Sequence, residues 1–294
     1  MKSKLDFTGE RFTPECEREI WHEHMHRYTF AREFCSSRVV LDAACGEGFG
    51  TALLSQVASH VTGVDISETA ITHARSRYGE ANNVAFEVAD CCALPFGDRH
   101  FDVVVSFETL EHLENQQQLL SEFRRVLRDD GLLILSSPDK AEYSDKQDFD
   151  NPFHVRELYR HELESLLAAH FPAFRLLGQV LAFHSVIFDE SPAAQARSHV
   201  LNQKGELTEG RVAQAPVYLI ALCAANESSL PETRGSVWLF DDDQSSVYRH
   251  YHHEIRKNMA AGGVLAEKQA EIDRLKARLE QAPVSWWQSW FKRR

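Results

Sequence analysis

The feature that most constrains the fold is a strand, a glycine-rich loop and a helix in direct succession over residues 39–54. Residues 39–41 are β-branched or apolar, which is typical of a buried strand. Gly46, Gly48 and Gly50 follow, and a helical pattern begins directly after them. This succession is the first unit of a doubly wound α/β domain, in which a ligand can approach the backbone closely and meet the N–H groups of the helix.

The spacing of the glycines argues against a dinucleotide site. A G-x-G-x-x-G fingerprint would need its third glycine at the position of Thr51. The chain instead reads D-x-x-x-G-x-G-x-G, starting at Asp42 on the strand. This pattern resembles motif I of the class I S-adenosylmethionine-dependent methyltransferases, although Ala44 stands where that family usually has glycine. The resemblance implies that the strand-end acid orients the loop and the methionine ammonium of the cofactor.

Further strands are indicated by apolar, β-branched runs along the chain. They lie at 61–67, 84–88, 101–106, 132–138, 173–184 and 216–223. With the first strand they predict an α/β fold with a doubly wound, Rossmann-like, seven-stranded mixed sheet.

The pattern divides the chain into four parts. Residues 1–36 form an N-terminal helical cover, and residues 37–223 form the methyltransferase domain to which the resemblance extends. Residues 224–243 read as a linker, rich in Asn, Ser, Pro and Gly. Residues 244–294 form a helical tail, which we expect to break at the glycine pair 262–263.

Composition narrows the class of partner and the compartment. The net charge is −12 at pH 7, which disfavours a nucleic-acid partner because phosphate binding needs a basic face. The six cysteines form no C-x-x-C pair, so we expect free thiols in a reducing cytoplasm. The start of the chain has no apolar signal segment, and no apolar run reaches the roughly 20 residues of a membrane span.

Two acids follow the second and third strands, at the edge where open α/β sheets bind ligands. Asp65 lies 19 residues beyond Gly46, and a carboxylate there can accept both ribose hydroxyls of an adenosine. The resemblance implies that Asp90 receives the adenine amino group. The cofactor contacts it implies are Asp42, Ala44, Gly46, Gly48, Asp65, Ile66, Asp90, Cys91 and Phe107.

A second cluster follows the fourth strand. Glu108, Glu111 and His112 share one face if this stretch is helical, and His154 arrives from beyond the acidic loop 139–152. Two carboxylates and two imidazoles form either a base cluster, with His112 and His154 catalytic, or a site for Mg²⁺ or Mn²⁺.

The E-x-x-E-H pattern is similar to that of the metal-dependent 2′-O-methyltransferases of small RNAs, and quinone-biosynthesis O-methyltransferases also carry it. Carried onto this chain, the resemblance implies the metal ligands Glu108, Glu111, His112 and His154.

Residues 10–14, the loop at 43–50, residues 106–108 and residues 151–154 together resemble methyltransferases associated with bacterial surface polysaccharides (O-antigens). The resemblance implies O-methylation of a sugar hydroxyl beside glycosyltransferases. From the N-terminal residues themselves we expect Arg11 and the leading helix to cover the cofactor cleft. The alternatives are a small-molecule methyltransferase acting on a quinone or phenol, and a cofactor-binding scaffold that recruits glycosyltransferases without catalysis.

The tail carries two signals of its own. Leu265, Ile272 and Leu279 repeat every seven residues, which suits a helix that pairs weakly or only in a homodimer. Residues 285–294 combine four aromatic side chains with three terminal cations. That composition fits either a peripheral contact with the inner membrane or docking onto protein.

Overall fold

The computed structural model describes residues 13, 19–182, 199–201, 207–209, 212, 214–242 and 246–281. The chain divides into two compact units, the first ending at Phe240 and the second beginning at Asp241. Each unit is described by itself.

The first unit alternates strands with helices, as the sequence predicts. Its strands are β1 (Val39–Ala43), β2 (His60–Asp65), β3 (Val84–Val88), β4 (Phe101–Phe107), β5 (Leu127–Pro138), β6 (Ala173–Gln179), β7 (His199–Leu201), β8 (Leu207–Glu209) and β9 (Tyr218–Ala224). Its α-helices are α1 (Glu19–Arg32), α2 (Phe49–Ser55), α3 (Glu68–Tyr78), α4 (Gln116–Val126) and α5 (Arg160–His170). Three short helical turns are η1 (Leu110–His112), η2 (Ala141–Asp145) and η3 (Glu227–Ser229).

The main sheet has seven strands in the order β3-β2-β1-β4-β5-β9-β6. β3 to β5 are all parallel, and β9 runs antiparallel to both of its neighbours. The predicted seven-stranded mixed α/β sheet is therefore confirmed. The strand order reverses on either side of β1, and ligands of open α/β sheets bind beyond the carboxyl ends of the strands at such a point.

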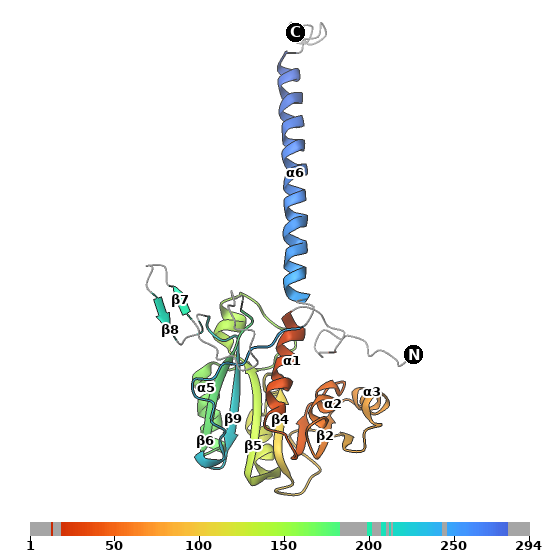
Figure 1. The fold of residues 1–294 in the computed structure, drawn as a ribbon, viewed down its shortest axis with the longest axis vertical. Helices are drawn as coiled ribbons and strands as arrows, with labels where there is room; N and C mark the ends of the chain where they lie inside the picture. Colours follow the sequence, from red (N-terminus) through yellow and green to blue (C-terminus); the bar gives the residue numbers. More distant parts are fainter. Residues whose placement is uncertain are drawn as a thin grey trace, which may run out of the picture. The chain divides into compact units, whose positions relative to one another are not determined.

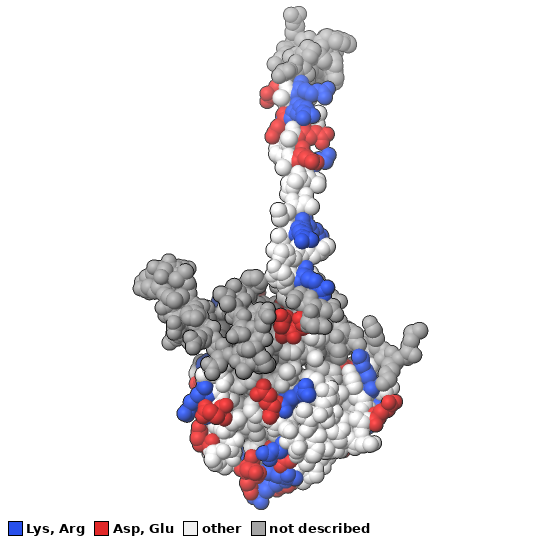
Figure 2. Space-filling model, in the orientation of Figure 1, with Lys and Arg blue, Asp and Glu red and all other residues white. Residues whose placement is uncertain are grey.

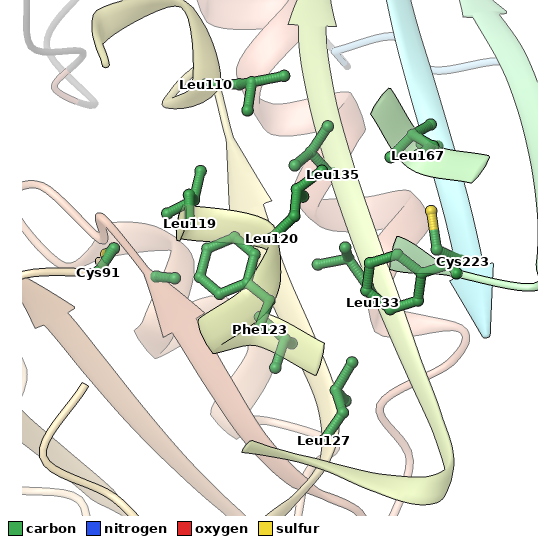
Figure 3. Packing of buried hydrophobic residues seen from close by; sticks show 14 of the residues in the cluster. Cys91, Leu110, Leu119, Leu120, Phe123, Leu127, Leu133, Leu135, Leu167 and Cys223 are labelled. Atoms are coloured by element: carbon green, nitrogen blue, oxygen red, sulfur yellow. The ribbon is translucent and has the colours of Figure 1, made fainter. Parts of the chain in front are cut away.

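One face of the sheet is covered by α4 and α5. Leu119, Phe123 and Leu167 of these helices pack against Leu133 and Leu135 of β5, and all five are at most 1% exposed (Figure 3). The apolar positions of α4 recur at helical spacing and form the stripe that the sheet buries. This packing fixes the positions of β4 and β5, and therefore of the residues that follow these strands.

The opposite face is covered by α1 and α2 (Figure 1). Tyr28 of α1 contacts Phe107 at the end of β4 edge-on, with ring centroids 5.0 Å apart. The predicted helix in the N-terminal cover is confirmed, and it brings Arg27 and Tyr28 to the edge of the sheet where β1 and β4 end.

One local prediction fails around the second cluster. Glu108 does not share a helix with Glu111 and His112, because η1 begins only at Leu110 and Glu108 has a positive φ of 50°. α5 begins at Arg160, and the segment before it is held by backbone bonds from Val155 and Arg156 to the carbonyl of Glu111.

The predicted linker 224–243 does not form a separate connector. Up to Phe240 it belongs to the first unit, where Leu230 is buried in the core and Trp238 packs against Phe30 with ring centroids 4.9 Å apart. Arg175 of β6 donates to the carbonyl of Pro231 over 2.6 Å. The polar composition of residues 224–240 reflects their exposure to solvent, because this segment packs along the first unit.

The second unit contains α6 (Ser246–Gln281), a continuous helix. The predicted break at Gly262 and Gly263 is wrong, although each glycine costs a helix about 1 kcal/mol relative to alanine. Residues 264–281, on the C-terminal side of the glycine pair, are rich in alanine, glutamate, lysine and leucine, which favour the helix. Its middle, residues 258–266, carries no charged side chain, as Figure 2 shows. No helix in the described ranges is long and apolar enough to cross a membrane.

The described cysteines, Cys35, Cys45, Cys91, Cys92 and Cys223, are free thiols, and Cys16 lies outside the described residues.

Candidate functional site

The loop after β1 turns through left-handed backbone conformations. Ala44 has φ 61° and Gly48 has φ 94°. A Cβ at Gly48 would lie 2.8 Å from Cβ of Ala74, and one at Gly50 would lie 2.1 Å from the ring of Tyr28. The glycines therefore allow α3 and α1 to close on the loop, while Ala44 adopts its conformation at a cost of about 1–2 kcal/mol.

Asp42 lies beneath this loop and is completely buried. Its two oxygens accept hydrogen bonds from the Tyr28 hydroxyl, over 3.0 Å, and from the Thr51 hydroxyl, over 2.6 Å. Burial raises its pKa from 3.8 to about 6, although both hydroxyls act in the opposite direction. The strand-end acid thus connects α1, β1 and α2.

Asp65 joins the ends of β1 and β2. Its Oδ2 accepts the N–H of Gly46 over 3.0 Å, and its Oδ1 accepts the N–H of Ser67 over 2.8 Å. The next residue, Ile66, is 74% exposed at the same edge. Two predicted cofactor residues are therefore in direct contact at the carboxyl edge of the sheet.

The other predicted cofactor contacts lie along the same edge. Asp90 is exposed beyond β3 and accepts the N–H of Cys92 over 2.8 Å. Cys91 is buried, which raises the pKa of its thiol. A hydrogen bond to the backbone of Ala44 partly offsets this rise. Phe107 ends β4 beneath the ring of Tyr28.

Glu47 is a loop residue that sequence reasoning missed. It is 1% exposed, accepts the Tyr78 hydroxyl over 2.9 Å, and lies 3.1 Å from Nε2 of His73. The carboxylate fixes the glycine loop to α3. Its partners lie 26 and 31 residues away, so no local pattern could indicate them.

The second cluster forms what we call the acceptor patch: Glu111, His112 and His154. One ligand atom from each lies within 4.8 Å of the others. The rings of His112 and His154 meet edge-on, with centroids 5.0 Å apart. The structure thus brings together three of the four predicted residues from two segments separated by more than 40 positions.

Hydrogen bonds orient both imidazoles. Nδ1 of His112 lies 2.9 Å from the carbonyl of Phe153, so it is the protonated nitrogen and directs Nε2 away from that carbonyl. Nδ1 of His154 lies 2.6 Å from Oε1 of Glu157, and its Nε2 lies 3.0 Å from the amide nitrogen of Asn151. A proton or cation taken up at Nε2 of His154 would displace the Asn151 amide.

Glu157 and Asn151 were not among the predicted site residues. The Glu157–His154 pair is the carboxylate–histidine arrangement that fixes the tautomer of catalytic and metal-binding imidazoles. The i, i+3 spacing of the pair was a signal in the sequence.

Glu108 lies outside the acceptor patch. Its Oε1 accepts the Ser136 hydroxyl over 2.6 Å and lies 3.6 Å from Nη1 of Arg27. The sequence did not indicate Arg27 as a site residue, and its side chain is completely buried. Glu108 therefore faces a cation from α1, whereas the predicted helix would have directed it toward His112.

Glu111 is the least satisfied group of the site. It is completely buried, and neither carboxylate oxygen has a hydrogen-bond partner in the described part of the chain. Burial, reinforced by repulsion from Glu108, raises its pKa well above the usual value. A buried carboxyl without partners beside two imidazoles fits either a bound proton or a divalent cation.

An open polar cleft of about 630 Å³ adjoins His154. Its walls come from the loop at 140–150 and from residues 154–157, and they include the side chains of Lys140, Asp145 and Arg156. A hydrophilic acceptor could reach His154 through this cleft. Arg11 and residues 285–294, which we also singled out, lie outside the described residues.

Comparison with known proteins gives the same family as the sequence patterns. Residues 41–135 match the family described as "Methyltransferase domain". A probable S-adenosylmethionine-dependent methyltransferase of Mycolicibacterium smegmatis is 37% identical over 219 residues, which cover 74% of this chain and 82% of that protein. One from Mycobacterium tuberculosis is 42% identical over 166 residues, 55% of this chain. The match spans 60% of the length of the M. tuberculosis protein.

Among solved structures, the YcgJ protein of Bacillus subtilis is similar to this fold. It has a TM-score of 0.50 at 21% identity, and the alignment covers 69% of this chain and 100% of that one. At this identity the likeness concerns the fold alone.

Proposed function

Because the chain belongs to the S-adenosylmethionine-dependent methyltransferases, we propose that it transfers the cofactor's methyl group to a sugar hydroxyl in the synthesis of a surface polysaccharide. The observation that carries this proposal is the His154–Glu157 pair at the mouth of the polar cleft. An alcohol is a weak nucleophile at neutral pH and needs a base, which this pair provides.

The chain's own groups account for the steps. Asp65 and the glycine loop would hold the nucleoside across the ends of β1 and β2, at the edge of the sheet that also carries Phe107 and the acceptor patch. Nε2 of His154 takes the proton of the acceptor hydroxyl, and Glu157 stabilises the imidazolium that results. When bound, the cofactor would supply its methyl group to the acceptor oxygen and leave as S-adenosylhomocysteine.

The character of the cleft supports a hydroxylated acceptor. Its walls are mostly charged or polar side chains, and its volume of about 630 Å³ can take a sugar with its neighbours. The main alternative, a quinone or phenol, would call for a largely apolar wall, and a phenol needs less help to lose its proton.

A methyl-transfer screen tests the substrate class. The full-length protein is incubated with labelled S-adenosylmethionine and with nucleotide sugars, lipid-linked oligosaccharides, a quinol and a catechol. We expect label in the sugar-containing acceptors. Label only in the quinol or catechol would refute the sugar proposal, and cofactor binding with no turnover on any acceptor would favour the scaffold.

As an alternative to His154 acting as the base, we propose that Glu111, His112 and His154 hold Mg²⁺ or Mn²⁺. The three ligand atoms lie within 4.8 Å of one another, and the unpartnered buried carboxyl of Glu111 fits a cation. A bound divalent ion would lower the pKa of the acceptor hydroxyl. Glu108, whose carboxylate contacts Ser136 and Arg27, is not part of this three-residue set.

Titration with Mn²⁺ tests the metal site without relying on turnover. Paramagnetic resonance should show Mn²⁺ bound by the native protein and lost in Glu111→Gln, while Glu114→Gln, an exposed neighbour, keeps it. Equal binding by both variants, or full activity in excess EDTA, would remove the metal and leave His154 as the base.

For the tail, we propose reversible contact of residues 285–294 with an anionic membrane and weak pairing of α6 with a second copy. Leu265 and Leu279 of α6 are 71% and 75% exposed, as an unpaired heptad face would be. Sedimentation with anionic vesicles should fall when residues 284–294 are deleted. Ultracentrifugation should show less dimer in Ile272→Glu than in the native chain.

A further inference from the structure

A second cavity lies on the face of the sheet that α1 covers. It has a volume of about 380 Å³ and is bounded by α1, β6, β9 and residues 236–239. Its wall is mainly apolar and includes Phe30, Leu177, Val180, Pro216, Ile220 and Trp238. The cavity shares no lining residue with the polar cleft beside His154, and its size lies within the range of about 300–1,000 Å³ typical of small-molecule sites.

The described lining of this cavity carries the opposite charge to the chain as a whole, although Arg160 also lies 3.9 Å from Glu164. The protein has 44 acidic and 32 basic residues. The described residues that line the cavity nevertheless include Arg27 and Arg160 and neither aspartate nor glutamate. A cationic, largely apolar site in an acidic protein favours a ligand that is both apolar and negatively charged.

Arg27 supplies the clearest indication of a missing ligand. Its Nε donates to Gln179 over 2.7 Å, and the guanidinium lies 4.2 Å from the centre of the Tyr218 ring. Nη1 and Nη2 are buried without a hydrogen-bond partner among the described residues, and the 3.6 Å to Glu108 is too long for a hydrogen bond. A buried donor left unpaired destabilises the folded protein. The two Nη groups of an arginine can donate parallel hydrogen bonds to one carboxylate or phosphate.

We propose that this cavity binds an amphipathic anion, with a carboxylate or phosphate head on Arg27 and an apolar body against Phe30, Ile220 and Trp238. This cavity is distinct from the polar cleft beside His154, although Arg27 adjoins both the cavity and Glu108. Because Nη1 of Arg27 also faces Glu108, the bound head group competes with Glu108 for the same cation. Occupancy of the cavity therefore alters the charge beside the acceptor patch.

Calorimetry on the full-length protein with four probes tests the site: octyl phosphate, octanoate, octanol and inorganic phosphate. We expect one or both of the amphipathic anions to bind about 10- to 100-fold more tightly than octanol or inorganic phosphate, the range for a charge-assisted pair. Comparing octyl phosphate with octanoate identifies the preferred head. Octanol binding as tightly as both anions would overturn the proposal.

Variants locate the binding. Arg27→Met should lower the affinity for the anions to that of octanol, whereas Arg99→Met, which removes an exposed arginine paired with Asp129, should change nothing. Val180→Trp should fill the cavity and abolish binding of all amphiphiles. If Arg27→Met does not fold, Arg27→Lys keeps the charge without the two-pronged geometry and should give an intermediate affinity.

Two outcomes would contradict the assignment. Anion binding that survives both Arg27→Met and Val180→Trp would place the probes elsewhere. Unchanged probe binding in Arg27→Met, together with weaker binding of S-adenosylhomocysteine, would instead make Arg27 a partner of the cofactor's own carboxylate.

Discussion

The two halves of the site differ in how completely their polar groups are satisfied. On the cofactor side, Asp42, Glu47 and Asp65 each accept two hydrogen bonds or ion-paired contacts from the protein. On the acceptor side, both oxygens of Glu111 and both Nη atoms of Arg27 are buried without hydrogen bonds in the described part of the structure. The first half is pre-organised by the fold, and the second is completed only when a ligand, a proton or a cation is present.

The largest expected effect concerns the acceptor side. His154→Gln should lower kcat by about 10²- to 10⁴-fold, because it removes the proton acceptor while leaving the cofactor side intact. His161→Gln, a change of an exposed histidine in α5, is the matched control and should keep full activity. The affinity for S-adenosylhomocysteine should be native in both variants. A His154→Gln enzyme with native kcat would assign the proton transfer to another group.

The cofactor side is tested by Asp65→Ala. The variant loses the acceptor of the Gly46 and Ser67 N–H groups and the expected ribose contact, so S-adenosylhomocysteine should bind at least about 100-fold more weakly by calorimetry. Asp129→Ala, at an exposed aspartate, should bind normally. Native affinity in Asp65→Ala would show that the nucleoside lies elsewhere.

The charge state of Asp42 gives a pH-dependent test. In the folded protein its pKa is about 6, above the unfolded value of 3.8, so the folded state binds the extra proton between these values. The contribution of Asp42 to the free energy of unfolding is therefore greatest below pH 3.8. It falls by about 3 kcal/mol in total as the pH rises through 6. Asp42→Asn lacks this loss, and its Tm relative to the native protein should rise from pH 4 to pH 7. A difference that does not change with pH would mean that Asp42 stays ionised.

The smallest effect sharpens the account of the glycine loop. Ala44 has φ 61°, and Ala44→Gly relieves that strain at the expense of a more flexible unfolded chain. The net gain should be up to about 1 kcal/mol, measured as a higher Tm in the absence of cofactor. Ala52→Gly, within α2, should instead lower Tm. A loss of stability in Ala44→Gly would show that the alanine is not strained.

The fold could be predicted from the sequence because its signals are local. The apolar strands, the glycine loop and the acids after successive strands each occupy a few neighbouring residues, and parallel strands bring their ends to one edge. For the same reason Asp65 and Gly46 could be placed together before their contact was seen.

The acceptor side was harder because its contacts are long-range. Glu108 leaves the expected helix because positive φ ends the strand there, and Arg27 reaches it from 81 positions earlier in the chain. Glu157 orients His154, yet its importance depends on a loop that returns to the carbonyl of Glu111. No spacing within a single element indicates Arg27 as a partner of Glu108.

A crystal structure of the protein with S-adenosylhomocysteine tests the central claim most directly. The account predicts the ribose hydroxyls on Asp65, the adenine beside Asp90, and the sulfur facing Glu111, His112 and His154. A nucleoside bound away from Asp65, or a sulfur directed away from these three side chains, would contradict it.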